Sequence, residues 1–151
     1  MRIIRIDHPG DGEKIMAPNE GFYRRDYDHS IANHDAFGAF LGGFVITGYL
    51  GHSVCIHMAG TSPSWCSREL LWMLFDYVFR SLKCGVAFAL IASDNKHALE
   101  LNIRAGFRHE TAVRDAFAPG RDMVVLAMRR ETCKWLNYEP KHYRRSTPDG
   151  R

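Results

Sequence analysis

Apolar and polar positions along the chain alternate with different periods in different segments. Val86–Ala92 is an unbroken apolar run, which predicts a strand covered on both faces in a parallel or mixed sheet. In the predicted strand His52–Met58, Val54 and Ile56 share one face, while Cys55 lies on the other. A sheet with a fully covered strand needs layers of helix, so the pattern indicates an α/β domain.

Two helices are predicted beside this sheet. The first, from about Ser64 to Leu82, contains a run that is apolar on most sides, and its start is assigned to Ser62–Pro63 or to Ser64. The second follows Asp94 or Asn95, either of which can cap a helix. It ends at Gly106, which suits a left-handed conformation.

The second helix starts at the carboxyl end of the strand Val86–Ala92. Its inner face carries Ala98, Leu101, Asn102 and Ala105. Strand, polar turn, short helix, glycine and a new extended segment from Phe107 form a crossover unit. Ligands with anionic or carbonyl groups commonly bind at such a helix N-terminus.

The remaining segments are short. Met1–Asp7 predicts an edge strand, and Phe37–Tyr49 predicts a strand or strand pair with a bulge. Phe107–Asp115 and Asp122–Arg130 predict a hairpin. The interval 8–35 is rich in Gly, Pro, Asp and Asn, and we expect loops with one short helix there.

Composition limits the class of protein. With 151 residues, 46% hydrophobic and 25% charged, we expect a single domain over 1–137 and a flexible basic tail over 138–151. No apolar run would span a bilayer and no signal peptide is expected, so a cytoplasmic protein without membrane contact is predicted. The four widely spaced cysteines favour reduced thiols, and the net charge of +3 gives little support for nucleic acid as a partner.

The segment SDNKHALELNIRAGF, with Asn95, Ala98 and the pair Gly106–Phe107, resembles a coenzyme A motif of the GNAT superfamily of N-acetyltransferases. The resemblance extends from about Phe37 to Leu136, including the continuation FRHETAVRDAFAPGRDMVVLAMRRETCKWL. It is strongest to Rim-like ribosomal-protein acetyltransferases and to short GNAT proteins of tailed bacteriophages. It implies a mixed, mostly antiparallel twisted sheet flanked by helices, with an abbreviated N-terminal part, and a host cytoplasm if a phage encodes the chain.

The resemblance also implies acetyl-CoA as cosubstrate. Acetyl-CoA needs free backbone N–H groups for its pyrophosphate and an open strand edge for its amide-rich arm. The implied contacts lie at the end of one strand, in the loop GTSPSWCSR and at the second helix. They are Met58, Ala59, Gly60, Ser64, Trp65, Cys66, Ser67, Arg68, Asn95 and Ala98. The loop departs from the family's glycine-rich pattern, and Trp65 makes it bulkier.

Direct acetyl transfer needs a base to take a proton from the amine. His57 is the first candidate, because the pKa of histidine lies near neutrality, and a histidine bonded within the core is the alternative. Glu110 and Asp115 are second candidates. Many GNAT enzymes have a tyrosine acid seven residues after the asparagine, where this chain has Asn102. No metal is expected, because His52 and His57 would lie on opposite faces of a straight strand.

The sequence therefore predicts an N-acetyltransferase that uses a ternary complex without a covalent intermediate. Its acceptor is a primary amine: a protein N-terminus, a lysine or a small amine. A non-catalytic CoA-binding or virion- or host-interaction module is the main alternative, and a transferase acting on nucleic acid is the third. A homodimer is left open.

Overall fold

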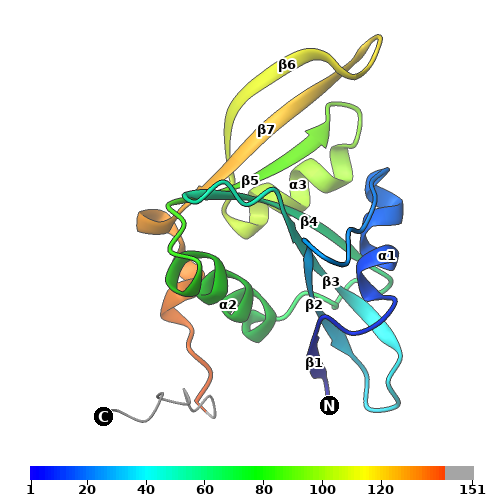
Figure 1. Cartoon of the computed structure of the whole chain (residues 1–151), viewed down its shortest axis with the longest axis vertical. Coiled ribbons are helices and arrows are strands. Elements are labelled where there is room, and N and C mark those ends of the chain that lie inside the picture. The colour runs from blue at the N-terminus through cyan, green and yellow to red at the C-terminus, as the bar shows by residue number, and fades with distance from the viewer. Residues whose placement is uncertain (142–151) are drawn as a thin grey trace.

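The computed structural model of the chain describes residues 1–141, and the predicted basic tail lies mostly outside them. Seven strands form one twisted sheet in the order β1-β2-β3-β4-β5-β7-β6 (Figure 1). The strands are β1 (Ile3–Ile6), β2 (His29–His34), β3 (Phe40–Thr47), β4 (Ser53–Gly60), β5 (Val86–Ala92), β6 (Arg108–Ala118) and β7 (Arg121–Arg129). Only β4 and β5 run parallel, so the predicted mixed, mostly antiparallel sheet is confirmed.

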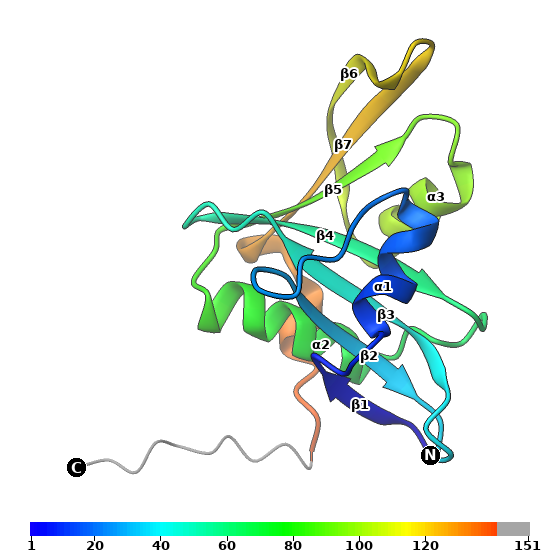
Figure 2. The ribbon, with the colours of Figure 1, turned by 45° about the vertical axis from the view of Figure 1, so that its right-hand side comes forward.

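The helices are short and lie on both faces of this sheet. They are α1 (Asp11–Met16), η1 (Ala17–Asn19), α2 (Arg68–Asp76), its π-helical continuation η2 (Tyr77–Ser81), α3 (Lys96–Ala105), η3 (Arg130–Thr132) and η4 (Lys134–Asn137). Val45 of β3 packs with α1, whereas its neighbours Phe44 and Ile46 belong to the core beside α2. Because adjacent strand residues face opposite sides, α1 and α2 cover opposite faces of the sheet. Figure 2 shows the two helices separated by β2 and β3.

The main core lies between the sheet and α2. Phe75 and Phe79 are fully buried there, with Phe107 against Phe75 at 6.1 Å between ring centroids. Burial of such large apolar side chains is the main source of folding free energy. Within the described residues, no helix is long and apolar enough to cross a membrane.

The predicted second helix is confirmed at both ends. Asn95 caps α3 by accepting a hydrogen bond from the Ala98 N–H at 3.2 Å. Gly106 leaves the helix with φ of 107°, a left-handed conformation that favours glycine. The edge strand near the N-terminus and the β6–β7 hairpin were also predicted correctly. Of the strand or strand pair predicted over Phe37–Tyr49, the structure has the single strand β3.

Three predictions about local structure were wrong. Part of the interval 8–35 is a strand, β2, and not only loop and helix. Helix α2 starts after Ser67, whose hydroxyl accepts from the Leu70 N–H at 3.2 Å, and not at Ser62–Pro63 or Ser64. β5 is buried on the face of Ala87 but only half-buried on that of Phe88.

Candidate functional site

The parallel strands β4 and β5 pair over three residues and then separate. Their register joins Ser53, Val54 and Cys55 to Val86, Ala87 and Phe88, and the pairing ends there. Beyond this point lies an opening of about 200 Å³. Its walls come from the second half of β4, the end of β5, the first turns of α3, η1 and Trp65.

Peptide groups of β4 face this opening. Asn19 of η1 donates hydrogen bonds to the carbonyl oxygens of Ile15 at 2.8 Å and Met58 at 3.0 Å. In an extended strand the N–H and C=O of one residue point to the same side. The Met58 carbonyl therefore turns toward η1, and its N–H faces the gap where β5 no longer pairs.

Six of the ten predicted cofactor contacts line the opening: Met58, Ala59, Gly60, Trp65, Asn95 and Ala98. The other four, Ser64, Cys66, Ser67 and Arg68, lie in the rest of the loop before α2 and at the first residue of that helix. Ser64 is exposed beside Ser62, Ser67 caps α2, and Arg68 lies over the Tyr138 ring at 5.4 Å. Burial raises the pKa of the Cys66 thiol to about 11, so this side chain remains protonated.

Trp65 fixes the path of the loop between β4 and α2. Its indole packs on Gly42 and Gly60, where any Cβ would collide with the ring, and it lies 5.2 Å from the Phe44 ring. Buried Asn33 of β2 donates to the Trp65 carbonyl at 2.8 Å and to the Ser67 hydroxyl at 3.1 Å. The loop is thus anchored to the sheet by the buried Trp65 side chain, and it lacks the run of glycines that the resemblance implies.

His57 is the one predicted base that lines the opening. Its Nε2 lies 3.1 Å from the Thr47 hydroxyl. Burial lowers the pKa of His57 below its ordinary value, and the charge of Asp28 opposes this only in part. The imidazole is therefore neutral at pH 7, the state in which it can accept a proton.

The structure does not bring Glu110 or Asp115 to the opening. Glu110 forms an ion pair with Arg129 at 2.6 Å on the β6–β7 hairpin. Asp115 accepts from the Gly120 N–H at 2.9 Å in the turn of that hairpin, with φ of 58°. Both carboxylates hold the hairpin in shape.

Asn102 is 2% exposed and lines the opening at the position where the resemblance implies a tyrosine. Its Nδ2 donates to the Ala98 carbonyl at 2.8 Å. Its Oδ1 is buried without a hydrogen-bond partner among the described residues. No tyrosine of the described residues lines the opening, but this amide oxygen can accept a hydrogen bond from a ligand N–H.

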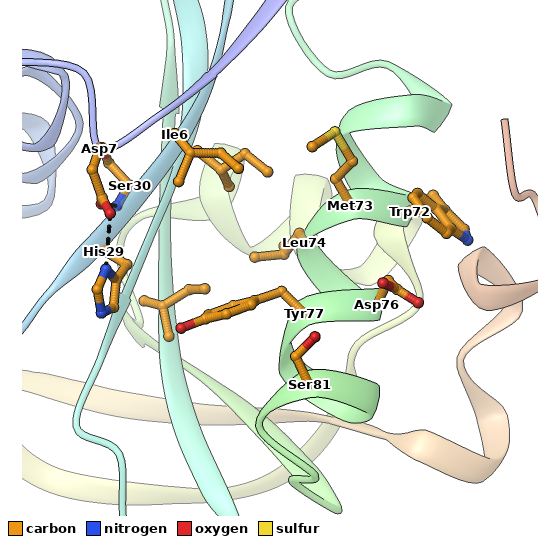
Figure 3. A pocket seen from close by; sticks show the side chains of 12 residues that line it. Ile6, Asp7, His29, Ser30, Trp72, Met73, Leu74, Asp76, Tyr77 and Ser81 are labelled. Atoms are coloured by element: carbon orange, nitrogen blue, oxygen red, sulfur yellow. Dashed lines mark hydrogen bonds and ion pairs between the residues drawn. The ribbon is translucent and has the colours of Figure 1, made fainter. Parts of the chain in front are cut away.

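A larger cavity, about 280 Å³, lies between α2 and the β1–β2 end of the sheet (Figure 3). Its walls include Met73, Leu74 and Tyr77, and Asp7 pairs with His29 at 3.0 Å on the opposite side. This cavity lies where β1, β2 and β3 are paired as a continuous ladder. It therefore lacks the gap between two parting strands that distinguishes the β4–β5 opening.

No family model and no curated protein matches this sequence. Among solved structures, a mutant form of the spermidine/spermine N-acetyltransferase SpeG from Vibrio cholerae is similar, with a TM-score of 0.68 and 17% identity, covering 93% of this chain and 100% of that one. The V. cholerae spermidine N-acetyltransferase in complex with CoA and spermine has a TM-score of 0.65 at 17% identity, covering 90% and 98% of the two chains. The chain has the GNAT fold.

A dodecameric structure of the V. cholerae enzyme is also similar, with a TM-score of 0.65, 18% identity and coverage of 92% and 98%. These matches establish the predicted fold over nearly the whole chain. They give no support to the narrower resemblance to Rim-like or phage proteins.

Sequence reasoning missed Asn19 and Asn33, because each acts through a contact with a distant backbone group and leaves no local pattern.

Asn19→Leu tests how the opening is held. The change keeps the size of the side chain but leaves the carbonyls of Ile15 and Met58 without their donor. We expect the free energy of unfolding, measured with urea, to fall by about 1–3 kcal/mol. Glu20→Gln, the adjacent residue in an exposed ion pair with Arg121, is the control and should change stability by less than about 1 kcal/mol. Equal stability of the Asn19 variant and wild type would show that η1 does not anchor β4.

Proposed function

We propose that the chain is an acetyl-CoA-dependent N-acetyltransferase and that the β4–β5 opening holds the cosubstrate. The observation that carries this proposal is the end of the β4–β5 ladder, which leaves the Met58 peptide facing a cavity beside a helix N-terminus. An amide-rich arm can replace the missing strand by pairing with the β4 edge. The similar fold of a protein solved with CoA and spermine supports the assignment.

The chain's own residues fit this arm. The Met58 N–H would donate to the thioester carbonyl and stabilise the negative charge that develops there during amine attack. The small side chain of Ala98 leaves room for the arm on the α3 side of the opening, and the Nδ2 of Asn95 remains available after its oxygen caps the helix. The buried Oδ1 of Asn102 would accept from an amide N–H of the arm.

In the reaction, neutral His57 would take a proton from the ammonium form of the acceptor. The free amine then attacks the thioester carbonyl, the C–N bond forms, and the C–S bond breaks to release the CoA thiolate. The attacking nitrogen then loses its second proton, which would pass through water to the thiolate, since the position of the expected acid is Asn102. The raised pKa of Cys66 fits transfer without a thiolate nucleophile from the enzyme.

The acceptor is proposed to be a primary amine. We favour a small polyamine as the acceptor, because the structurally similar enzymes are spermidine N-acetyltransferases. Protein N-termini and lysines are the second choice. A non-catalytic CoA-binding module is the second candidate, favoured by Asn102 in place of a tyrosine and by the tryptophan-anchored loop. Titration with acetyl-CoA, followed by thiol release with spermidine, lysine and N-terminal peptides, separates the two.

Ala98→Leu tests the location of the cosubstrate. The larger side chain should crowd the opening, and overpacking of about 1–3 kcal/mol corresponds to acetyl-CoA binding roughly 5- to 150-fold weaker by calorimetry. Lys96→Leu, on the same helix but outside the opening, should bind as wild type does. If wild type shows no binding in the micromolar range, acetyl-CoA is not the ligand. Equal affinity in both variants would place acetyl-CoA elsewhere.

His57→Gln tests the base. Because burial lowers the pKa of His57, the imidazole becomes charged only at a pH below the roughly 6.5 of an ordinary histidine, and wild type should lose kcat/KM there. The ratio of wild-type to variant kcat/KM cancels the ionisation of the acceptor amine. We expect this ratio to rise with pH to a plateau of roughly 100-fold or more. A ratio that stays constant from about pH 5 to pH 8.5 would exclude His57 as the base.

A further inference from the structure

Three metal-ligating side chains converge where the N-terminal segment meets the end of β2. They are His8, in the loop after β1, Asp11, the first residue of α1, and His34, the last residue of β2. One ligand atom from each lies within 4.8 Å of the others. None of the three lines the β4–β5 opening, so the proposed acetyl transfer leaves the cluster unexplained.

The cluster holds a buried carboxylate with too few hydrogen-bond donors. Asp11 and His34 are each 1% exposed. His34 Nε2 lies 3.2 Å from Asp11 Oδ1, with which it forms a hydrogen bond, and 3.1 Å from Oδ2. Oδ2 itself has no hydrogen-bond partner in the part of the chain that the structure describes. His34 Nδ1 has no hydrogen-bond partner among the described residues. Burying a carboxylate with one donor is costly, and a bound cation would remove that cost.

The backbone directs His34 into the cluster. The register between β2 and β3 shifts between Asn33 and His34, and such irregularities change the direction of a side chain. The His34 ring then packs edge-on against the His8 ring at 5.1 Å and the Phe40 ring at 6.1 Å. The position of the imidazole is therefore fixed by packing before any ligand binds.

The distances suit a small transition-metal ion. Zinc bonds of about 2.0–2.1 Å in a tetrahedral site place two ligand atoms roughly 3.3 Å apart. The Asp11–His34 pair already has this spacing, and only His8 has to move inward. His8 is half-buried and lies in a loop, so the inward shift of up to roughly 1.5 Å requires no change in the core.

A cavity and a guanidinium group both lie beside His8. His8, Gly10 and Tyr23 line a cavity of about 230 Å³, which gives a metal ion a path to the His8 side of the cluster. Arg5 Nη1 lies 3.4 Å from His8 Nε2. This guanidinium opposes a cation, and it has to turn away when His8 becomes a ligand.

We propose that His8, Asp11 and His34 bind one divalent transition-metal ion, with zinc favoured by the two imidazoles and one carboxylate. The ion joins the β1–α1 connection to the end of β2. This site departs from the expectation that no metal binds. That expectation considered His52 and His57 on one strand, whereas the cluster is assembled from three elements.

Zinc titration of the chelator-treated full chain tests the proposal. We expect one zinc ion per chain and a higher melting temperature when zinc is present, because binding only to the folded state stabilises it. Cobalt in place of zinc should give the visible absorption of a tetrahedral ion with nitrogen and oxygen ligands. A thiolate charge-transfer band would instead place the metal on cysteine and overturn the assignment.

Variants locate the site within the chain. Asp11→Asn and His8→Ala should each weaken zinc binding roughly ten-fold or more, since each removes a ligand. His52→Gln is the matched control, an exposed histidine outside the cluster, and should leave binding unchanged. If Asp11→Asn does not fold, His8→Ala decides alone, because this half-buried loop residue is replaceable. Zinc affinity unchanged by His8→Ala, or no zinc binding by wild type, would overturn the proposal.

Discussion

The site depends on the point at which backbone pairing between β4 and β5 ends: the two strands pair for three residues and then separate. An unpaired strand edge is normally a liability, because its N–H and C=O groups invite other chains. Here the edge is enclosed between η1, α3 and Trp65, so it faces a cavity rather than bulk solvent. The same separation creates the space for a ligand and supplies the peptide groups that would bind it.

The surrounding elements keep the two strands apart. Asn19 holds the Met58 carbonyl from one side, and α3 begins at the end of β5 on the other. Arg121 of β7 bridges Glu20 and Asp94 at 3.3 and 3.1 Å and so joins the two sides at the surface. These exposed pairs add little stability. The hydrogen bond from Asn19 and the packing of the apolar side chains of α3 on the core hold the two sides more firmly.

Local patterns predicted much of the fold, and long-range contacts account for what they missed. β5, α3 and Gly106 follow from an apolar run, a capping residue and a left-handed glycine, all of which are adjacent in sequence. β2 was missed because its burial comes from α1 and α2, which pack on its two faces, and not from its own composition. In the site, Met58, Asn95 and Ala98 were named from the resemblance. Glu110 and Asp115 were misplaced because sequence alone does not show that the hairpin uses both carboxylates.

The most direct test of the central claim is amide hydrogen exchange followed by NMR, with and without acetyl-CoA. If the cosubstrate arm pairs with the open edge of β4, the Met58 amide should exchange more slowly when acetyl-CoA is bound. Cys55, which already lies in the β4–β5 ladder, should change little. An unchanged Met58 amide, together with protection around Tyr77 in the cavity beside α2, would contradict the account.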